Sequence, residues 1–310
     1  MYENVYAKSD GKPVRKGSLY AWVLASRPKT LSGAAVPVMI GSSLAFADSR
    51  ASEDLQFGWI PMILCFLFAF LMQIDANFIN DLFDYLGGKD DSRSRLGPRR
   101  ACSEGWISVK SMKRAIAVTT LLACIAGLPL VLFGGIEMVV VGLFCVIFCF
   151  LYTTHLSSKG LGDLLVVMFF GVIPVCATYY IQVHSIGITV VLASIACGLV
   201  IDCLLMVNNF RDREADRISG KITLVVRLGE KNSLLLYLLL GYLAVLLGII
   251  FLFGSHPLAF ILSLLWLPLH HSAYLGIRRV MRGKALNRLL ALTARNILAY
   301  GILVSLGLLL

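Results

Sequence analysis

Two clusters of acidic and amide side chains are the residues of this sequence best suited to chemistry. The first cluster contains Asn77, Asn80, Asp81 and Asp84, and Asp90 follows shortly after it. On a helix, Asn77, Asp81 and Asp84 fall at positions i, i+4 and i+7 and therefore share one face. Asn80 and Asp84 lie one helical turn apart. The spacing predicts a polar face at the end of a helix.

The second cluster contains Asn209, Asp212 and Asp216, at positions i, i+3 and i+7. It begins about 130 residues after the first. Each cluster directly follows a long apolar stretch. The sequence therefore predicts that the clusters stand at equivalent ends of two helices and form two halves of one site.

Carboxylate and amide oxygens are hard ligands suited to Mg²⁺, which usually keeps waters and bridges to substrate phosphates. Two facing sets of such ligands can hold a diphosphate through metal ions, and nearby Lys and Arg can neutralise the remaining charge. The metal ions would stabilise diphosphate as a leaving group. The expected metal ligands are Asn80, Asp81, Asp84, Asp90, Asp212 and Asp216.

The alternative interpretation is that both clusters are solvated helix ends. Polar side chains at a membrane boundary are costly unless they are hydrated or used. Two separate occurrences with matching helical phase favour a shared site over two solvated faces.

The composition indicates a membrane protein. Of the 310 residues, 58% are hydrophobic, and the mean hydropathy is +0.82, above the range of soluble domains. The sequence predicts an all-α, polytopic protein with about nine transmembrane helices, forming a single domain over residues 1–310. The expected spans are 31–47, 59–79, 115–133, 136–154, 162–182, 187–207, 233–253, 257–276 and 293–310. The polar residues 1–18 lack the features of a signal peptide.

Basic residues predict the orientation. If the N-terminus and every second loop are cytoplasmic, 27 of the 28 Lys and Arg lie on that side and only Arg50 lies opposite. This asymmetry fits the positive-inside rule. It accounts for the net charge of +10 without a nucleic-acid partner. We expect a multi-pass protein of the cell inner membrane, with both acidic clusters on the cytoplasmic side.

These residues resemble the UbiA superfamily of intramembrane prenyltransferases. The acidic clusters carry the general resemblance. The third Asp of this family is spaced variably, so Asp91 is an alternative to Asp90. Segments 27–31, 97–100, 159–164 and 208–230 are similar to the 1,4-dihydroxy-2-naphthoate polyprenyltransferases within it. The resemblance keeps its order from residue 27 to about residue 232, whereas the last two spans share only general hydropathy.

The resemblance implies that the helices are bundled around a central cavity. It also implies Mg²⁺-dependent transfer of an all-trans polyprenyl group from its diphosphate to 1,4-dihydroxy-2-naphthoate. Loss of CO₂ would give demethylmenaquinol in menaquinone biosynthesis. The implied partners are these two substrates and the lipid bilayer. The implied catalytic residues are Asp81, Asp84, Asp163, Asp212 and Asp216. The implied substrate-binding residues are Arg27, Lys29, Asn77, Asn80, Tyr152, Lys159, Asn209, Arg211 and Lys221.

Two other functions stay open at the level of sequence. Related prenyltransferases that act on 4-hydroxybenzoate or another acceptor share the acidic clusters. A membrane transporter is the alternative from a different class, and it would need ionisable residues deep in several spans and discontinuous helices. The acids here gather at helix ends instead, which favours an enzyme.

Overall fold

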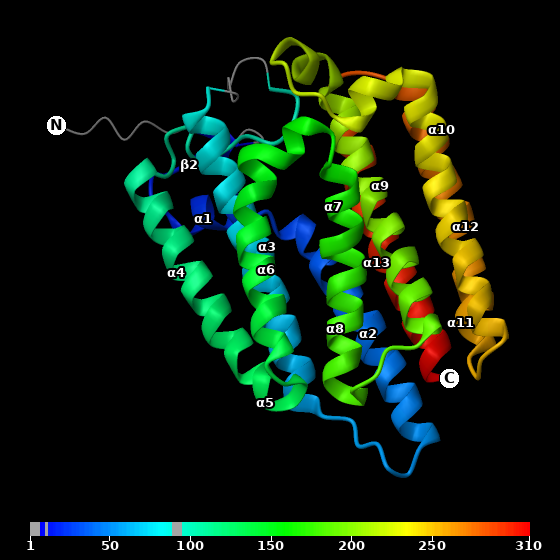
Figure 1. The fold of residues 1–310 in the computed structure, drawn as a ribbon. Coiled ribbons are helices and arrows are strands. Elements are labelled where there is room, and N and C mark those ends of the chain that lie inside the picture. Colours follow the sequence, from blue (N-terminus) through cyan, green and yellow to red (C-terminus); the bar gives the residue numbers. More distant parts are fainter. Residues whose placement is uncertain (1–6, 10–11, 89–94) are drawn as a thin grey trace.

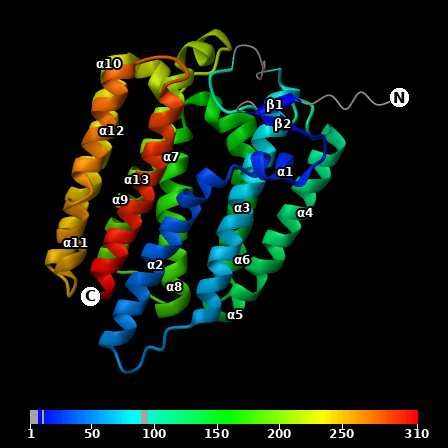
Figure 2. The same cartoon turned by 180° about the vertical axis from the view of Figure 1, so that it is seen from behind.

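A computed structural model describes residues 7–9, 12–88 and 95–310 of the chain. Long helices that run side by side make up almost all of it (Figures 1 and 2). A short antiparallel hairpin of β1 (Ala7–Ser9) and β2 (Lys12–Val14) precedes the first helix. The expected ligand Asp90 and its alternative Asp91 lie outside the described residues.

The helices before the middle of the chain are α1 (Leu19–Ser26), η1 (Pro28–Thr30), α2 (Leu31–Ala51), α3 (Trp59–Leu86), α4 (Val109–Gly127), η2 (Leu128–Leu130), α5 (Val131–Gly134), α6 (Glu137–Leu151), η3 (Tyr152–Leu156) and η4 (Ser157–Lys159). The remaining helices are α7 (Gly162–Val167), η5 (Met168–Val172), α8 (Ile173–Val183), α9 (Ile188–Ile218), α10 (Leu224–Leu247), η6 (Gly248–Leu252), α11 (Pro257–Leu264), α12 (Leu267–Val280) and α13 (Leu286–Leu309). Of these, η3 and η5 are π-helical.

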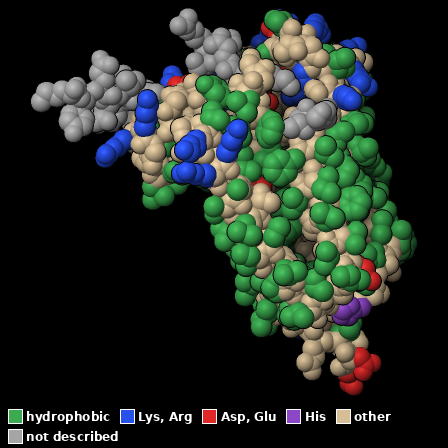
Figure 3. All heavy atoms as spheres, turned by 60° about the vertical axis from the view of Figure 1, so that its left-hand side comes forward, with side chains coloured by type: hydrophobic (Ala, Val, Ile, Leu, Met, Phe, Trp, Pro, Cys, Tyr) green, Lys and Arg blue, Asp and Glu red, His purple; other side chains and the backbone are tan. Residues whose placement is uncertain are grey.

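The expected membrane-spanning bundle is confirmed. In the described part of the chain, eight helical segments are long and apolar enough to cross a bilayer. The expected span over 136–154 corresponds to the shorter apolar helix α6, which continues into η3. Many Leu, Ile and Val side chains point outward along the bundle (Figure 3). Helices suit this environment because their backbone groups bond to one another and need no water.

Helices α3 and α9 extend beyond their apolar stretches, to Leu86 and Ile218, and so carry both acidic clusters. Both cluster-bearing ends lie at the same end of the bundle, opposite to the C-terminus (Figure 1). The polar connection after α9 is therefore mostly helical, since α10 already begins at Leu224. The expected span over 233–253 begins later than α10, because hydropathy locates the lipid-facing part of a helix and not the whole helix. Gly229, with φ of 74°, interrupts α10 near its beginning.

Small residues allow the helices to approach closely. A Cβ atom on Gly171 would lie 2.5 Å from the Cα atom of Gly198, where η5 crosses α9. A Cβ atom on Gly307 would lie 2.4 Å from the Cα atom of Ala259, where α13 meets α11. Lipid tails are as apolar as the side chains, so close packing drives helix association in a bilayer. The contact at Gly198 holds α9 against η5 and thereby helps to position the second cluster.

The shared end of α3 and α9 predicts one common sidedness for the polar loops. In a cysteine-free background, Lys110→Cys and Ser219→Cys should react with a membrane-impermeant maleimide from the same side of the membrane. Ser255→Cys, in the connection before α11, should react from the opposite side. All three residues are exposed in the structure. Labelling of residues 110 and 219 from different sides would contradict the arrangement of the bundle.

Candidate active site

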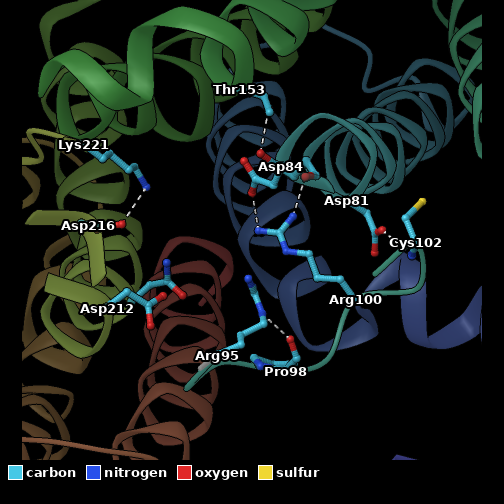
Figure 4. Close-up of polar contacts among 12 residues, drawn as sticks. Asp81, Asp84, Arg95, Pro98, Arg100, Cys102, Thr153, Asp212, Asp216 and Lys221 are labelled. Atoms are coloured by element: carbon cyan, nitrogen blue, oxygen red, sulfur yellow. Dashed lines mark hydrogen bonds and ion pairs between the residues drawn. The ribbon is translucent and has the colours of Figure 1, made fainter. Parts of the chain in front are cut away.

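Asp84 and Asn80 form the part of the first cluster that faces the bundle interior. Asp84 forms an ion pair with Arg100, with 2.6 Å between Oδ2 of Asp84 and Nη2 of Arg100 (Figure 4). The other terminal nitrogen of Arg100 donates to the backbone oxygen of Asn80 at 2.5 Å. The Asn80 side chain accepts from the Thr153 hydroxyl at 2.7 Å. The first cluster is thus held by a buried guanidinium and by a hydroxyl from η3.

Asp81 points away from Asp84, toward the loop that follows α3 (Figure 4). Its two carboxylate oxygens accept from the backbone N–H groups of Ala101 and Cys102, at 2.8 and 2.9 Å. Only 1% of the residue is exposed. The structure therefore does not bring Asp81 together with the other acids, and its observed contacts close the loop.

Asp212 and Asp216 stand on α9, across from Asp84 (Figure 4). Arg211 forms a bidentate ion pair with Asp212. Its Nε atom donates to Oδ1 at 2.8 Å, and its Nη2 atom donates to Oδ2 at 2.5 Å. Lys221 lies 3.7 Å from the carboxylate of Asp216. The Oδ2 atom of Asp216 is buried and has no hydrogen-bond partner among the described residues. A buried carboxylate oxygen without a partner is unfavourable and marks a place where a ligand fits.

A cavity of about 580 Å³ opens beside both clusters. Polar residues from η1 and the residue before it, from α3, from η3 and from α9 line this end of the cavity: Arg27, Thr30, Asn77, Asn80, Tyr152 and Asn208. The rest of the wall is mostly apolar and includes Cys65, Phe68, Val131, Met138, Phe169 and Phe170. From Asn80 to Cys65 the cavity follows about 22 Å of α3, at a rise of about 1.5 Å per residue. The cavity therefore joins an anion-compatible end to a long apolar body.

The other predicted site residues are distributed unevenly. Asn77 donates to the backbone oxygen of Ser26 at 2.9 Å and to the Thr30 hydroxyl at 3.0 Å. Arg27 lines the cavity from a left-handed backbone position with φ of 49°. The Lys29 and Lys159 side chains are exposed.

Asp163 and Asn209 are both buried. Neither carboxylate oxygen of Asp163 has a hydrogen-bond partner among the described residues. Asn208, rather than Asn209, lines the cavity. The sequence contained a signal for Asn208, which stands one helical turn before Asp212. It contained no comparable signal for Thr153. Arg100 lies in the similar segment 97–100, but no role is predicted for it from the sequence because its partner Asp84 is distant in the chain.

The acidic clusters are suited to a divalent ion whose ligand shell is completed by a substrate. Within the described residues, no group of three His, Cys, Asp or Glu side chains converges closely enough to hold a metal ion by itself. Asp84, Asp212 and Asp216 offer hard oxygen ligands, and one oxygen of Asp216 is buried without a partner. Mg²⁺ commonly takes only one or two carboxylates and fills its shell with water and phosphate oxygens. This donor set is compatible with that mode of binding.

Comparisons with known proteins show which family and which fold the chain is similar to. Residues 34–295 match the model of the UbiA prenyltransferase family. The chain is 35% identical over 298 residues to a protein of Escherichia coli (strain K12) named 1,4-dihydroxy-2-naphthoate octaprenyltransferase, covering 93% of this chain and 94% of that one. An apo UbiA homolog from Aeropyrum pernix K1 has a similar fold, with a TM-score of 0.66, 14% identity and coverage of 91% and 97%. A UbiA homolog from Archaeoglobus fulgidus bound to GPP and Mg²⁺ gives a TM-score of 0.61, 16% identity and coverage of 92% and 99%.

The different contacts of Asp81 and Asp84 predict different effects of their removal. Asp81→Ala should leave two backbone N–H groups without an acceptor and lower the free energy of unfolding by about 1–3 kcal/mol for each. Asp84→Ala should lower Mn²⁺ affinity about tenfold or more with a smaller loss of stability. Thermal unfolding in EDTA and Mn²⁺ titration by electron paramagnetic resonance measure the two effects. If Asp81→Ala weakens Mn²⁺ binding without loss of stability, Asp81 is a metal ligand, as its position in the sequence suggested.

Proposed function

The chain belongs to the UbiA prenyltransferase family, and from this premise we propose that it transfers a polyprenyl group from its diphosphate to 1,4-dihydroxy-2-naphthoate in menaquinone biosynthesis. The reaction would release CO₂ and diphosphate. Family membership makes the protein an integral membrane prenyltransferase and removes the support for a transporter. The acceptor is proposed from the similarity to the Escherichia coli relative over most of both chains.

The observation that carries the proposal is the shape and polarity of the cavity. One end has Arg27, Asn80 and Asn208 beside the acidic clusters, and the body is apolar. A polyprenyl diphosphate has the same division, with an anionic head and a long hydrocarbon chain. The head would lie between the clusters, and the chain would lie along α3.

The proposed roles follow from position and charge. Asp84, Asp212 and Asp216, with Asn80, would hold Mg²⁺, which when bound neutralises charge on the departing diphosphate. Lys221, beside Asp216, would contact the diphosphate as a point charge. Arg27 would bind an anionic group of either substrate. Arg211 is less available for this role, because each of its side-chain nitrogens already has a partner.

The remaining predicted residues lie around this centre. Asn77 holds the Ser26–Thr30 region against α3 and so would position Arg27. Asp163 would support the acceptor from the start of α7. Lys29, Lys159 and Asn209 stay predicted substrate-binding residues.

The bond changes balance without an added oxidant or base. The C–O bond to diphosphate breaks, and its electron pair leaves with diphosphate. An electron pair of the naphthoate ring forms the new C–C bond at the carbon that bears the carboxylate. The bond from that carbon to the carboxylate then breaks, its electron pair returns to the ring, and CO₂ departs. The allylic carbon of the prenyl group carries positive charge after the C–O bond breaks and before the C–C bond forms.

The cavity wall would protect and stabilise that positive charge. Tyr152, Phe148 and Phe169 line the cavity, and the ring centroids of Phe148 and Phe169 are 4.9 Å apart. Aromatic faces attract a cation through their negative quadrupole. The apolar wall would also exclude water, which would otherwise capture the allylic cation.

The membrane placement follows from the distribution of charge. The described Lys and Arg side chains on the face shown in Figure 3 gather toward the cluster-bearing end, and the lipid-facing middle is apolar. We propose that this end faces the cytoplasm, in line with the positive-inside rule. The protein would then receive its acceptor from the cytoplasm and its polyprenyl donor from the bilayer.

An assay with 1,4-dihydroxy-2-naphthoate labelled at its carboxyl carbon tests the reaction. Purified protein with Mg²⁺ and a polyprenyl diphosphate should release labelled CO₂ in step with prenylated product. EDTA should abolish both, and added Mg²⁺ should restore them. Faster prenylation of 4-hydroxybenzoate, or retention of the label in the product, would overturn the assignment of the acceptor. Full activity in EDTA would overturn the role of the metal.

A further inference from the structure

Arg211 is a buried hub between the second cluster and its surroundings. Only 1% of its side chain is exposed. Besides the bidentate pair with Asp212, its Nη2 atom donates to Asn208 at 2.8 Å, and its Nη1 atom donates to the side-chain oxygen of Asn287 at 2.9 Å. Asn287 belongs to α13, so this guanidinium joins two helices that are distant in sequence.

The same hub reaches the loop formed by residues 95–102, which follows the first cluster. The side-chain nitrogen of Asn287 donates to the backbone oxygen of Leu96 at 2.8 Å. Next to Leu96, Gly97 lies directly against the guanidinium, because a Cβ atom there would be 2.7 Å from the Nη2 atom of Arg211. The loop is therefore seated on the second cluster at residues 96 and 97.

The other end of the 95–102 loop is seated on the first cluster. Arg100 pairs with Asp84 and with the backbone of Asn80. Asp81 binds the backbone N–H groups at positions 101 and 102. Within the loop, Nε of Arg95 donates to the backbone oxygen of Pro98 at 2.7 Å (Figure 4). One short, internally braced segment thus connects the two halves of the site.

We propose that Arg211 and Asn287 are positioning residues that couple the two acidic clusters through the 95–102 loop. The chain of contacts runs from Asp212 through Arg211 and Asn287 to the loop, and from the loop through Arg100 to Asp84. It sets the separation of Asp84 and Asp212 before metal and substrate arrive. The proposal rests on the proposed function, since the coupled carboxylates are the proposed metal ligands.

This coupling would oppose the repulsion between the two acidic clusters. Carboxylates that face each other repel, and helices α3 and α9 could relieve the repulsion by moving apart. A guanidinium presents a rigid fork that fixes both the charge and the direction of a carboxylate. Outer contacts that orient ligands in this way typically change metal affinity about tenfold to a hundredfold when removed.

A double-mutant cycle tests the coupling between residues that do not touch. Arg100→Gln releases the loop from Asp84, and Asn287→Ala releases it from Arg211. Thermal unfolding of the full-length protein in EDTA should show non-additive effects, because both changes break the same chain of contacts. Mn²⁺ titration should show about a tenfold loss of affinity for Asn287→Ala. Additive stability effects together with an unchanged Mn²⁺ affinity would overturn the proposal.

Asn296→Ala is the matched control. Asn296 is also on α13, and its side-chain nitrogen donates to the backbone oxygen of Leu269 at 3.0 Å, away from the clusters. It should lower stability, combine additively with Arg100→Gln and leave Mn²⁺ affinity within about threefold, a change of less than 1 kcal/mol. If Asn296→Ala weakens Mn²⁺ binding as strongly as Asn287→Ala, a general loosening of α13 explains both and the coupling is refuted.

Gly97→Ala provides a second variant if Asn287→Ala does not fold. Its methyl group should displace the Arg211 guanidinium and weaken Mn²⁺ binding, whereas an unchanged affinity would count against the coupling. The EDTA measurements separate this inference from the proposed function. A wild-type protein that binds no Mn²⁺, even with a polyprenyl diphosphate present, overturns the metal-dependent function, while non-additive stability effects in EDTA still support the coupling.

Discussion

Pairing of arginine with carboxylate is the interaction on which the site depends. Asp84 and Asp212 stand at the ends of two apolar helices, where an unpaired charge near a membrane is costly. Arg100 and Arg211 supply the opposite charge from almost fully buried positions, with 9% and 1% of their side chains exposed. The carboxylates themselves stay about one quarter exposed, at 25% and 26%. The charge is thus balanced from the protein side while the outer side of each carboxylate remains accessible to a ligand.

The apolar bundle and the charged end solve different physical problems with the same helices. Helix α3 is apolar from Trp59 and continues into the first cluster without a break, so one rigid element carries both the cavity wall and Asp84. Helix α9 does the same for Asp212. Close packing through glycine, as at Gly198, holds α9 in place where lipid offers no hydrophobic driving force. The position of the acids relative to the apolar cavity is therefore set by helix packing rather than by flexible loops.

Hydropathy and helical phase explain how much of this arrangement was predictable. The nine expected spans, the shared end of the clusters and the family resemblance follow from patterns within about 20 residues, which is the length needed to cross a bilayer. The direction of the Asp81 side chain does not follow from such patterns. Helical phase predicts that Asp81 faces the same way as Asp84, but its carboxylate accepts hydrogen bonds from backbone N–H groups of the loop after α3. The contacts of Arg100, which lies in the similar segment 97–100, and of Asn287 are not predicted for the same reason. Their roles depend on contacts that only the folded chain creates.

The proposed sharing of Mg²⁺ between the carboxylates and the donor has a thermodynamic consequence. Mg²⁺ usually combines one or two carboxylates with water and with phosphate oxygens of the substrate. Metal and diphosphate then raise each other's affinity by the same factor, since coupling between two ligands is reciprocal. Carboxylates fixed beforehand by guanidinium groups make this joint binding more favourable, because little further ordering is required. The metal would accordingly be held firmly only when the leaving group that it stabilises is in place, which ties activation of the donor to its capture in the apolar cavity.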